Sequence, residues 1–117
     1  MNKRAVGTAY EKVAGIYLET QGYRILEYNF RDRRGEIDIV ARDGHCLVFV
    51  EVKYRKDGRK GDPLEAVGFG KQRIICRTAR YYLFTHHLSM DTPCRFDVVA
   101  VEGDRIRVVK NAFPYIE

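Results

Sequence analysis

Apolar residues near the N-terminus recur at the spacing of one helical face. They occupy the i, i+3, i+4 and i+7 positions that an amphipathic helix buries. These residues are Val6, Ala9, Tyr10, Val13, Ala14, Tyr17 and Leu18. Gly22 follows them, where a glycine commonly ends a helix. A second, longer helix is expected over residues 71–86. Its inward residues are Ile75, Ala79, Tyr82 and Leu83.

Several segments between and after these helices have the composition of β-strands. They are residues 23–30, 36–41, 46–54, 95–101 and 105–110. Asp43-Gly44 predicts a hairpin turn between the second and third, because primed turns need positive φ. A polar loop over residues 56–62 leads to Asp62-Pro63, which has the residues of a helix start. The order α-β-β-β-α-β-β predicts an α/β fold with a mixed central sheet flanked by helices.

The chain has 117 residues, a length that favours a single domain over residues 1–117. No apolar run approaches the roughly 20 residues of a membrane span, and no membrane partner is expected. The three cysteines are far apart and lack metal-ligand spacing, so we expect reduced thiols and a cytoplasmic location. Lys and Arg number 21 against 16 acids, and the net charge of +5 suits a polyanionic partner.

Charged residues interrupt the most apolar strands. Glu36 and Asp38 lie in Gly-Glu-Ile-Asp-Ile-Val-Ala, and Glu51 and Lys53 lie in Phe-Val-Glu-Val-Lys. Strand side chains alternate between faces, so the members of each pair share a face. If the predicted turn has two residues, paired residue numbers sum to about 87, and Asp38 lies diagonal to Glu51 at roughly 7–8 Å.

Two converging carboxylates need a positive partner. At about 4 Å their repulsion is about 4 kcal/mol near a protein surface. Lys53 is one candidate, but it leaves the second acid unpaired. Magnesium is the better answer, because it binds one or two carboxylates together with waters and phosphates. Lys53 would then hold an attacking water or a phosphate oxygen. The alternative is an ordinary same-face ion pair, which contributes little to stability.

These two motifs together resemble the PD-(D/E)XK nuclease superfamily, whose restriction-endonuclease-like core is α-β-β-β-α-β. More narrowly, residues 7–113 resemble the YraN family of small bacterial proteins, predicted endonucleases distantly similar to archaeal Holliday-junction resolvases. Ile37 stands where the proline in the superfamily's name would precede the aspartate. The resemblance implies cleavage of DNA that depends on Mg²⁺ or Mn²⁺.

The resemblance also assigns roles to residues of the motifs. Asp38 matches the metal-binding aspartate, Glu51 the second acidic ligand and Lys53 the catalytic lysine. The carbonyl of Val52 would be a further metal ligand. Glu11, on the first predicted helix, matches an acid that completes the catalytic site in resolvase-like members.

Residues around Glu11 give independent support for that position. Gly7, Ala14 and Gly15 share its helical face, and such small residues would let the sheet come close. The alternative is an ordinary exposed glutamate on a helix.

Two other acids have open interpretations. Glu36 shares a face with Asp38, and is either an outer metal ligand or the partner of an arginine such as Arg34. Asp97 lies in an apolar strand, where it would anchor a loop or an arginine such as Arg95 or act beside the site. Arg107 is a second candidate partner for Asp97.

Basic residues flank the acidic motifs and predict contacts with phosphates. The candidate nucleic-acid contacts are Arg34, Arg55, Lys56, Arg59, Lys60, Lys71, Gln72 and Arg73. The same clusters include Arg31, Arg33, Arg77 and Arg80. Gln72 enters through the resemblance, as an accessory polar residue near the site. Tyr54, Tyr81 and Tyr82 are candidates for stacking on unpaired bases, although Tyr82 fits the core stripe. The alternative is that these charges only coat a solvated face.

The sequence therefore predicts a metal-dependent endonuclease acting on DNA. Branched or flapped DNA is the candidate substrate, and a homodimer is the candidate assembly. The first alternative is a nucleic-acid-binding module without catalysis, whose binding would be salt-sensitive but indifferent to metal. The second is a structural or interaction protein, in which Glu51→Gln changes stability and DNA binding is absent.

Overall fold

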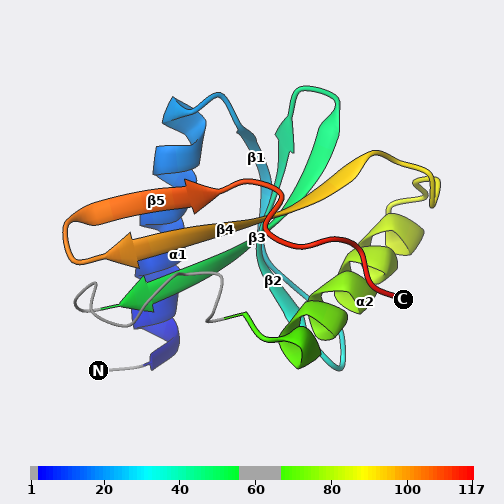
Figure 1. The fold of residues 1–117 in the computed structure, drawn as a ribbon, viewed down its shortest axis with the longest axis horizontal. Coiled ribbons are helices and arrows are strands. Elements are labelled where there is room, and N and C mark those ends of the chain that lie inside the picture. Colours follow the sequence, from blue (N-terminus) through cyan, green and yellow to red (C-terminus); the bar gives the residue numbers. More distant parts are fainter. Residues whose placement is uncertain (1–2, 56–66) are drawn as a thin grey trace.

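The computed structural model describes residues 3–55 and 67–117. In chain order their elements are α1 (Lys3–Thr20), β1 (Arg24–Arg31), β2 (Glu36–Asp43), β3 (Cys46–Arg55), α2 (Phe69–Thr85), β4 (Cys94–Glu102) and β5 (Arg105–Val109). The sheet order is β1-β2-β3-β4-β5, antiparallel except for the parallel β3–β4 pair that α2 connects (Figure 1). The predicted element order and mixed α/β sheet are confirmed. The helix start expected at residues 62–63 lies outside the described residues.

The two helices cover opposite faces of the sheet (Figure 1). α1 packs Ala14 and Leu18 into one core cluster, and α2 packs its predicted inward residues into the other. β3 is buried on both faces: Val48 and Val50 belong to the α1 cluster, whereas Phe49 belongs to the α2 cluster. Strands buried on both faces read as nearly continuous apolar runs, which explains the composition of β3 and β4.

α1 ends where the sequence predicts it. Gly22 adopts φ 93°, a conformation that glycine enters without strain. The N–H of Gly22 donates to the carbonyl of Glu19 at 3.1 Å, and the N–H of Tyr23 donates to that of Leu18 at 3.0 Å. These two bonds satisfy carbonyls at the helix end and turn the chain toward β1.

The β2–β3 hairpin turns one residue later than predicted. Gly44 and His45 form the turn, with Gly44 at φ 62°. Asp43 remains in β2 and pairs with Cys46. The carboxylate of Asp43 accepts a hydrogen bond from Arg95 of β4 at 2.8 Å, which holds this residue in the sheet.

The later turn changes the strand register. Phe49 faces Val40 rather than Asp38, so the predicted pairing is wrong. Continued along the strands, the observed register carries Asp38 toward Glu51, directly across rather than diagonally.

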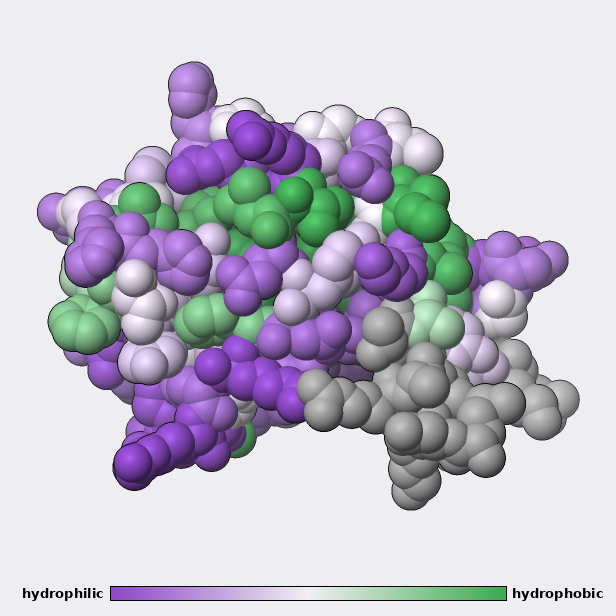
Figure 2. All heavy atoms as spheres, turned by 180° about the vertical axis from the view of Figure 1, so that it is seen from behind, coloured by the Kyte–Doolittle hydropathy of each residue, from purple (hydrophilic) through white to green (hydrophobic). Residues whose placement is uncertain are grey.

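The side of the sheet that carries α1 has a mixed surface. Figure 2 shows patches of hydrophobic side chains among hydrophilic ones on this side. Val13 and Ile16 of α1 are 42% and 60% exposed, so the helix has apolar residues on its outer side as well. Among the described helices, none combines the length and apolar character needed to cross a membrane.

Candidate functional site

β1 and β2 both change the direction of their side chains at one point. Tyr28 pairs with Ile39, and both lie in the α1 cluster. Two residues on, Phe30 pairs with Ile37, and both lie in the α2 cluster. Between them Asn29 adopts φ 57°, a left-handed conformation that few non-glycine residues adopt. The strands therefore switch faces here instead of alternating regularly.

Asp38 lies at this irregularity, where β2 separates from β3. The backbone pairing between these strands stops at Ile39 and Val50. Beyond that point the Oδ2 atom of Asp38 accepts a hydrogen bond from the N–H of Val52 at 2.7 Å. A side-chain carboxylate thus takes the place of a main-chain acceptor and is held against β3.

Three carboxylates meet beside this bond. Oxygen atoms of Glu11, Glu36 and Asp38 lie within 4.8 Å of one another. Glu11 reaches the sheet because α1 comes close to it: a Cβ atom on Gly15 would collide with the hydroxyl of Tyr28. The prediction that small residues beside Glu11 let the sheet come close therefore holds at Gly15. The Oε1 atom of Glu11 is buried and has no hydrogen-bond partner among the described residues.

Burial and mutual repulsion oppose full ionisation of this group. Burial, followed by repulsion from Glu51, raises the pKa of Asp38 to about 8, although the Val52 N–H acts in the opposite direction. Burial also raises the pKa of Glu11, against hydrogen bonds with Asp38 and Asn29 that lower it. Burial and repulsion between carboxylates both favour the neutral carboxyl form. Near pH 7 the cluster therefore retains a proton that a bound cation would displace.

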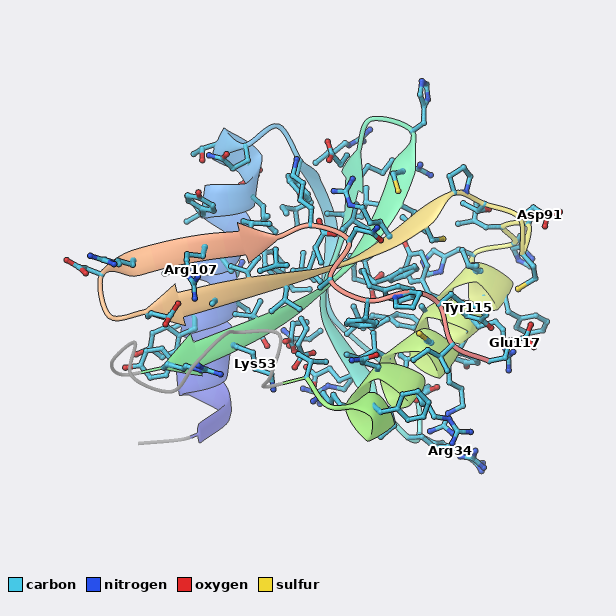
Figure 3. The ribbon with its side chains drawn as sticks, viewed as in Figure 1. Arg34, Lys53, Asp91, Arg107, Tyr115 and Glu117 are labelled. Atoms are coloured by element: carbon cyan, nitrogen blue, oxygen red, sulfur yellow. The ribbon has the colours of Figure 1, made fainter. Side chains whose placement is uncertain are left out.

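Glu51 joins the cluster to two lysines. Glu51 is only 5% exposed, and its Oε1 atom lies 3.5 Å from Lys53 Nζ and 3.4 Å from Lys71 Nζ. Lys53, labelled in Figure 3, belongs to β3. Lys71 belongs to the beginning of α2, so sheet and helix each bring one cation. The predicted placement of Glu51 and Lys53 on one face is confirmed.

The tightest group of acids differs from the predicted metal ligands. Those ligands are Asp38, Glu51, Glu11 and the Val52 carbonyl. Among the described residues, Glu36 rather than Glu51 lies within 4.8 Å of both other acids. Glu36 also pairs with an arginine, one of its two predicted roles, but the partner is Arg31 at 3.4 Å rather than Arg34. The Glu-x-Asp spacing was the available signal, because regular alternation would place both acids on one side of a strand, although β2 switches faces between Ile37 and Ile39.

The predicted nucleic-acid contacts are divided between different parts of the molecule. Lys71 lies at the acid cluster, whereas Gln72 donates to the carbonyl of Val67 at 2.9 Å and fixes the entry into α2. Arg73 lines a hollow beside the C-terminal segment. Figure 3 shows Arg34 well apart from Lys53. Arg55 ends β3, and Lys56, Arg59 and Lys60 lie outside the described residues.

A second buried acid lies on β4, away from this cluster. Asp97 is 1% exposed. It accepts hydrogen bonds from the Tyr23 hydroxyl at 2.7 Å and from the Asn111 N–H at 2.9 Å. Arg95 donates to both carboxylate oxygens, each at 2.9 Å. The expected anchoring of an arginine is confirmed for Arg95, whereas Arg107 pairs with a different acid.

Comparison with known proteins places the chain among its relatives. The model of the Uncharacterised protein family UPF0102 matches residues 10–101. The chain belongs to this family. A UPF0102 protein of Lachnoclostridium phytofermentans is 55% identical over 113 residues, which cover 97% of this chain and 96% of the relative. The UPF0102 protein YraN of Salmonella typhi is 41% identical over 114 residues, covering 97% and 87%.

The predicted resemblance to the YraN family is therefore confirmed. A UPF0102 protein of Syntrophus aciditrophicus adds a third relative, 51% identical over 111 residues that cover 92% of this chain and 87% of the relative. The matched range contains every acid of the cluster and both lysines. The family description states no activity, so the chemistry must be derived from the geometry of these residues.

Proposed function

We propose that this UPF0102 protein is a metal-dependent endonuclease that hydrolyses phosphodiester bonds in DNA. The observation that carries this proposal is the group formed by Glu11, Glu36 and Asp38, with oxygens within 4.8 Å of one another. When ionised, carboxylates this close repel unless a cation lies between them. The restriction-endonuclease-like core belongs to the same proposal and is supported by the α-β-β-β-α-β order of the elements.

The donor set suits Mg²⁺ or Mn²⁺. Carboxylate oxygens are hard ligands, which these cations prefer. The Oε1 atom of Glu11, buried without a hydrogen-bond partner among the described residues, is available as a ligand. Asp38 is held in place by the Val52 N–H. Glu51 and the Val52 carbonyl join the ligand set through the family resemblance.

The cation would supply an acidified water and neutralise charge on a phosphate. Lys53 would hold the attacking water or a phosphate oxygen, and its side chain is 26% exposed at the edge of the cluster. Lys71 contacts the same Glu51 oxygen from α2. An approaching phosphate would therefore meet two ammonium groups beside the acids.

DNA is proposed as the substrate from the basic composition and from the resemblance. The net charge of +5 favours a polyanion. Branched and flapped DNA are the substrate structures to test first. A binding module without catalysis would use the same lysines and arginines, but metal would not affect it.

Cleavage assays test the proposal directly. Purified protein would be incubated with labelled single-stranded, duplex, flapped and four-way-junction DNA, and with RNA, in Mn²⁺, Mg²⁺ or EDTA. We expect cleavage only with metal, and a loss of about 100-fold or more in Asp38→Asn, since single charge-stabilising groups contribute about this much. The asparagine keeps an oxygen for the Val52 N–H, so the fold should persist.

A matched pair on α1 controls for surface effects. Glu11→Gln should abolish cleavage, whereas Glu19→Gln, an exposed position on the same helix, should leave it unchanged. Calorimetric titration with Mn²⁺ should show binding to the wild type and not to Asp38→Asn. If no substrate is cut and Mn²⁺ binds both proteins equally or neither, the catalytic proposal is wrong.

A further inference from the structure

A second basic surface lies on the side of α2 that faces away from the sheet core. It is a groove of about 560 Å³ between the turn at residues 32–35 and the second half of α2. Its charged and aromatic lining consists of Asp32, Arg33, Arg34, Arg77, Arg80, Tyr81 and Phe84, so four arginines face a single acid. In Figure 3, Arg34 and Lys53 lie on either side of the start of α2. The groove is therefore distinct from the acid cluster.

Close packing fixes the turn that forms one wall of the groove. A Cβ atom on Gly35 would lie 2.5 Å from Ile74 and 2.6 Å from Thr78, so the turn rests directly on α2. Asp32 accepts hydrogen bonds from the N–H groups of Arg34 and Gly35, each at 2.8 Å. The turn is thus held on both sides, and its two arginines line the groove.

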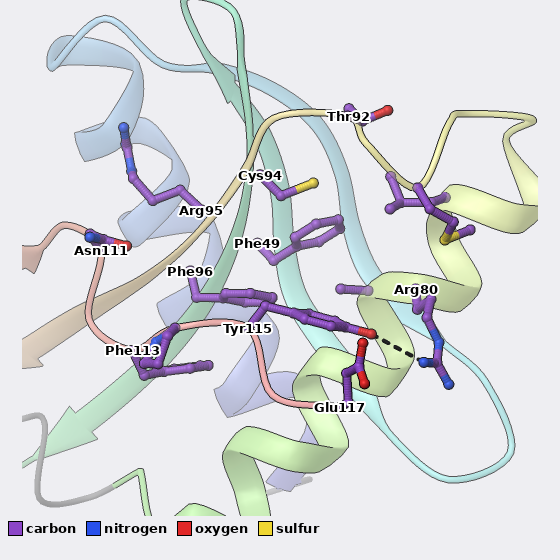
Figure 4. Close-up of a pocket in the computed structure, with 14 residues that line it drawn as sticks. Phe49, Arg80, Thr92, Cys94, Arg95, Phe96, Asn111, Phe113, Tyr115 and Glu117 are labelled. Atoms are coloured by element: carbon purple, nitrogen blue, oxygen red, sulfur yellow. Dashed lines mark hydrogen bonds between the residues drawn. The ribbon is translucent and has the colours of Figure 1, made fainter.

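The arginines of the groove have few internal partners. None of the four forms a salt bridge with a carboxylate of the described residues. Arg77 has a buried Nε–H without a hydrogen-bond partner in the same part of the chain. Arg80 donates to the hydroxyl of Tyr115 at 3.1 Å, at the border of a neighbouring hollow of about 490 Å³ (Figure 4). No carboxylate of the described residues therefore neutralises the charge of these arginines, which suits an anionic ligand.

Two aromatic rings lie among these arginines. Tyr81 is 45% exposed and Phe84 is 70% exposed. They are three residues apart on a helix, which places them on neighbouring turns of one face. The ring centroids of Phe30 and Tyr81 lie 6.1 Å apart in a tilted arrangement. Exposed rings beside arginines match a ligand that alternates flat apolar groups with negative charges.

We propose that this groove binds an unpaired strand of nucleic acid, with phosphates on the arginines and bases stacked on Tyr81 and Phe84. Bases in a duplex hide their faces, so only an unpaired strand can use both rings. This groove proposal depends on the proposed nuclease function in one respect only, namely that the ligand is a nucleic acid. The turn that lines the groove leads directly into Glu36, so the groove and the acid cluster involve adjacent residues of the chain.

Binding in EDTA tests the groove without cleavage. Fluorescence anisotropy would measure a labelled single-stranded DNA of mixed sequence across a series of salt concentrations. We expect Arg33→Gln/Arg34→Gln to weaken binding and to reduce the slope of log K against log salt by about 1.4, since each phosphate contact contributes about 0.7 on single strands. The control is Arg24→Gln/Arg105→Gln, which removes the same charge from exposed positions on β1 and β5 and should leave the slope nearly unchanged.

A separate variant tests the proposed stacking of bases on the aromatic rings. Phe84→Ala should weaken single-strand binding at least about fivefold without changing the salt slope, because base stacking involves no counterion release. It should leave duplex binding unchanged. Equal binding by the wild type and all groove variants would overturn the proposal. A wild type that binds no single strand would also overturn it. If the wild type binds polyglutamate instead, the groove is a site for an acidic polypeptide and the proposal is wrong.

Failure here and failure of the nuclease proposal are distinguishable. Asp38→Asn should keep full single-strand binding in EDTA, because the acid cluster lies outside the groove. If the protein cleaves DNA with metal but every groove variant binds single strands as the wild type does, the groove proposal is wrong and the nuclease proposal stands. Groove-dependent binding without any cleavage supports the groove and contradicts the nuclease.

Discussion

Asp97 and Asp38 are both acids within apolar strands, yet their surroundings are opposite. Asp97 receives hydrogen bonds from a tyrosine hydroxyl, from both arms of an arginine and from a backbone N–H. Asp38 receives one backbone hydrogen bond and lies within 4.8 Å of two further carboxylates. One acid is surrounded by donors, and the other is surrounded by acids.

This difference separates an acid that stabilises the fold from one that is available for chemistry. A buried charge is tolerated when it is paired and hydrogen-bonded. Asp97 meets that condition and ties β4 to Tyr23 before β1 and to Asn111 after β5. Asp38 does not meet it without an added cation. The same substitution at the two positions should therefore change stability in opposite directions.

Asp97→Asn should have the largest effect. The amide would place its NH₂ group against Arg95 or the Asn111 N–H, both of them donors, and would leave Arg95 without its buried counter-charge. We expect the free energy of unfolding to fall by about 3–5 kcal/mol, as when one partner of a buried pair is removed. Urea denaturation measures this, with Asp104→Asn in the exposed β4–β5 turn as control. A loss near that of the control would contradict the comparison.

Asp38→Asn should instead raise the free energy of unfolding, by about 1–3 kcal/mol at pH 8. The folded pKa is about 8, while an unfolded aspartate has a pKa of about 3.9. The folded wild type therefore keeps a proton that the unfolded chain releases, and its stability falls as pH rises between these values. The expected gain in stability is smaller than the full pKa shift of Asp38 implies. Part of that shift comes from repulsion by Glu11 and Glu51, which can be relieved when either of these acids takes up the proton instead.

Urea denaturation of both proteins from pH 4 to pH 8 tests the sign. The stability difference should be near zero at pH 4 and should grow with pH. Saturating Mn²⁺ should then remove the advantage of the asparagine, because ligand binding stabilises only the protein that binds it. A difference independent of pH, or a variant less stable than wild type at pH 8, would refute the contrast with Asp97.

Tyr23→Phe should weaken the Asp97 network without breaking it. The hydroxyl donates to Asp97 at 2.7 Å and accepts from Arg95 at 3.1 Å. Asp97 keeps its other donors, so we expect a loss of about 1–2 kcal/mol in the free energy of unfolding. Tyr17→Phe is the control, because the described residues offer no hydrogen bond to its hydroxyl. Equal effects of the two substitutions would show that the Tyr23 hydroxyl contributes nothing specific.

The fold was largely predictable because periodicity and turn residues report local structure. The stripe before Gly22 and the apolar runs of β3 and β4 correctly defined the helix end and the central strands. The hairpin register was missed because Asp43 is held in β2 by Arg95, a residue far away in sequence. A turn preference alone does not contain that long-range contact.

The acid cluster was predictable in part. Alternation brought Asp38 near Glu51 and put Glu51 and Lys53 on one face, as observed. The tight grouping with Glu36 lies where β1 and β2 switch faces, and no sequence pattern indicated the positive φ of Asn29 at that point. The basic residues were predicted to contact phosphates beside the acidic motifs, but the fold divides them between the acid cluster and the groove. Such divisions arise from packing in three dimensions, which spacing along the chain does not encode.

Lys110→Met should have the smallest effect, although Lys110 belongs to the stabilising network. Its ammonium group lies 3.6 Å from Asp43, whose same oxygen already accepts a hydrogen bond from Arg95 at 2.8 Å. The lysine side chain is 56% exposed, so water screens the pair. Methionine keeps the apolar stem near the Tyr23 ring. We expect a change in the free energy of unfolding of at most about 0.5 kcal/mol, shrinking further in high salt. A larger loss of stability that does not depend on salt would contradict this prediction. It would mean that Lys110, acting through Asp43 and Arg95, also contributes to the stabilisation of Asp97.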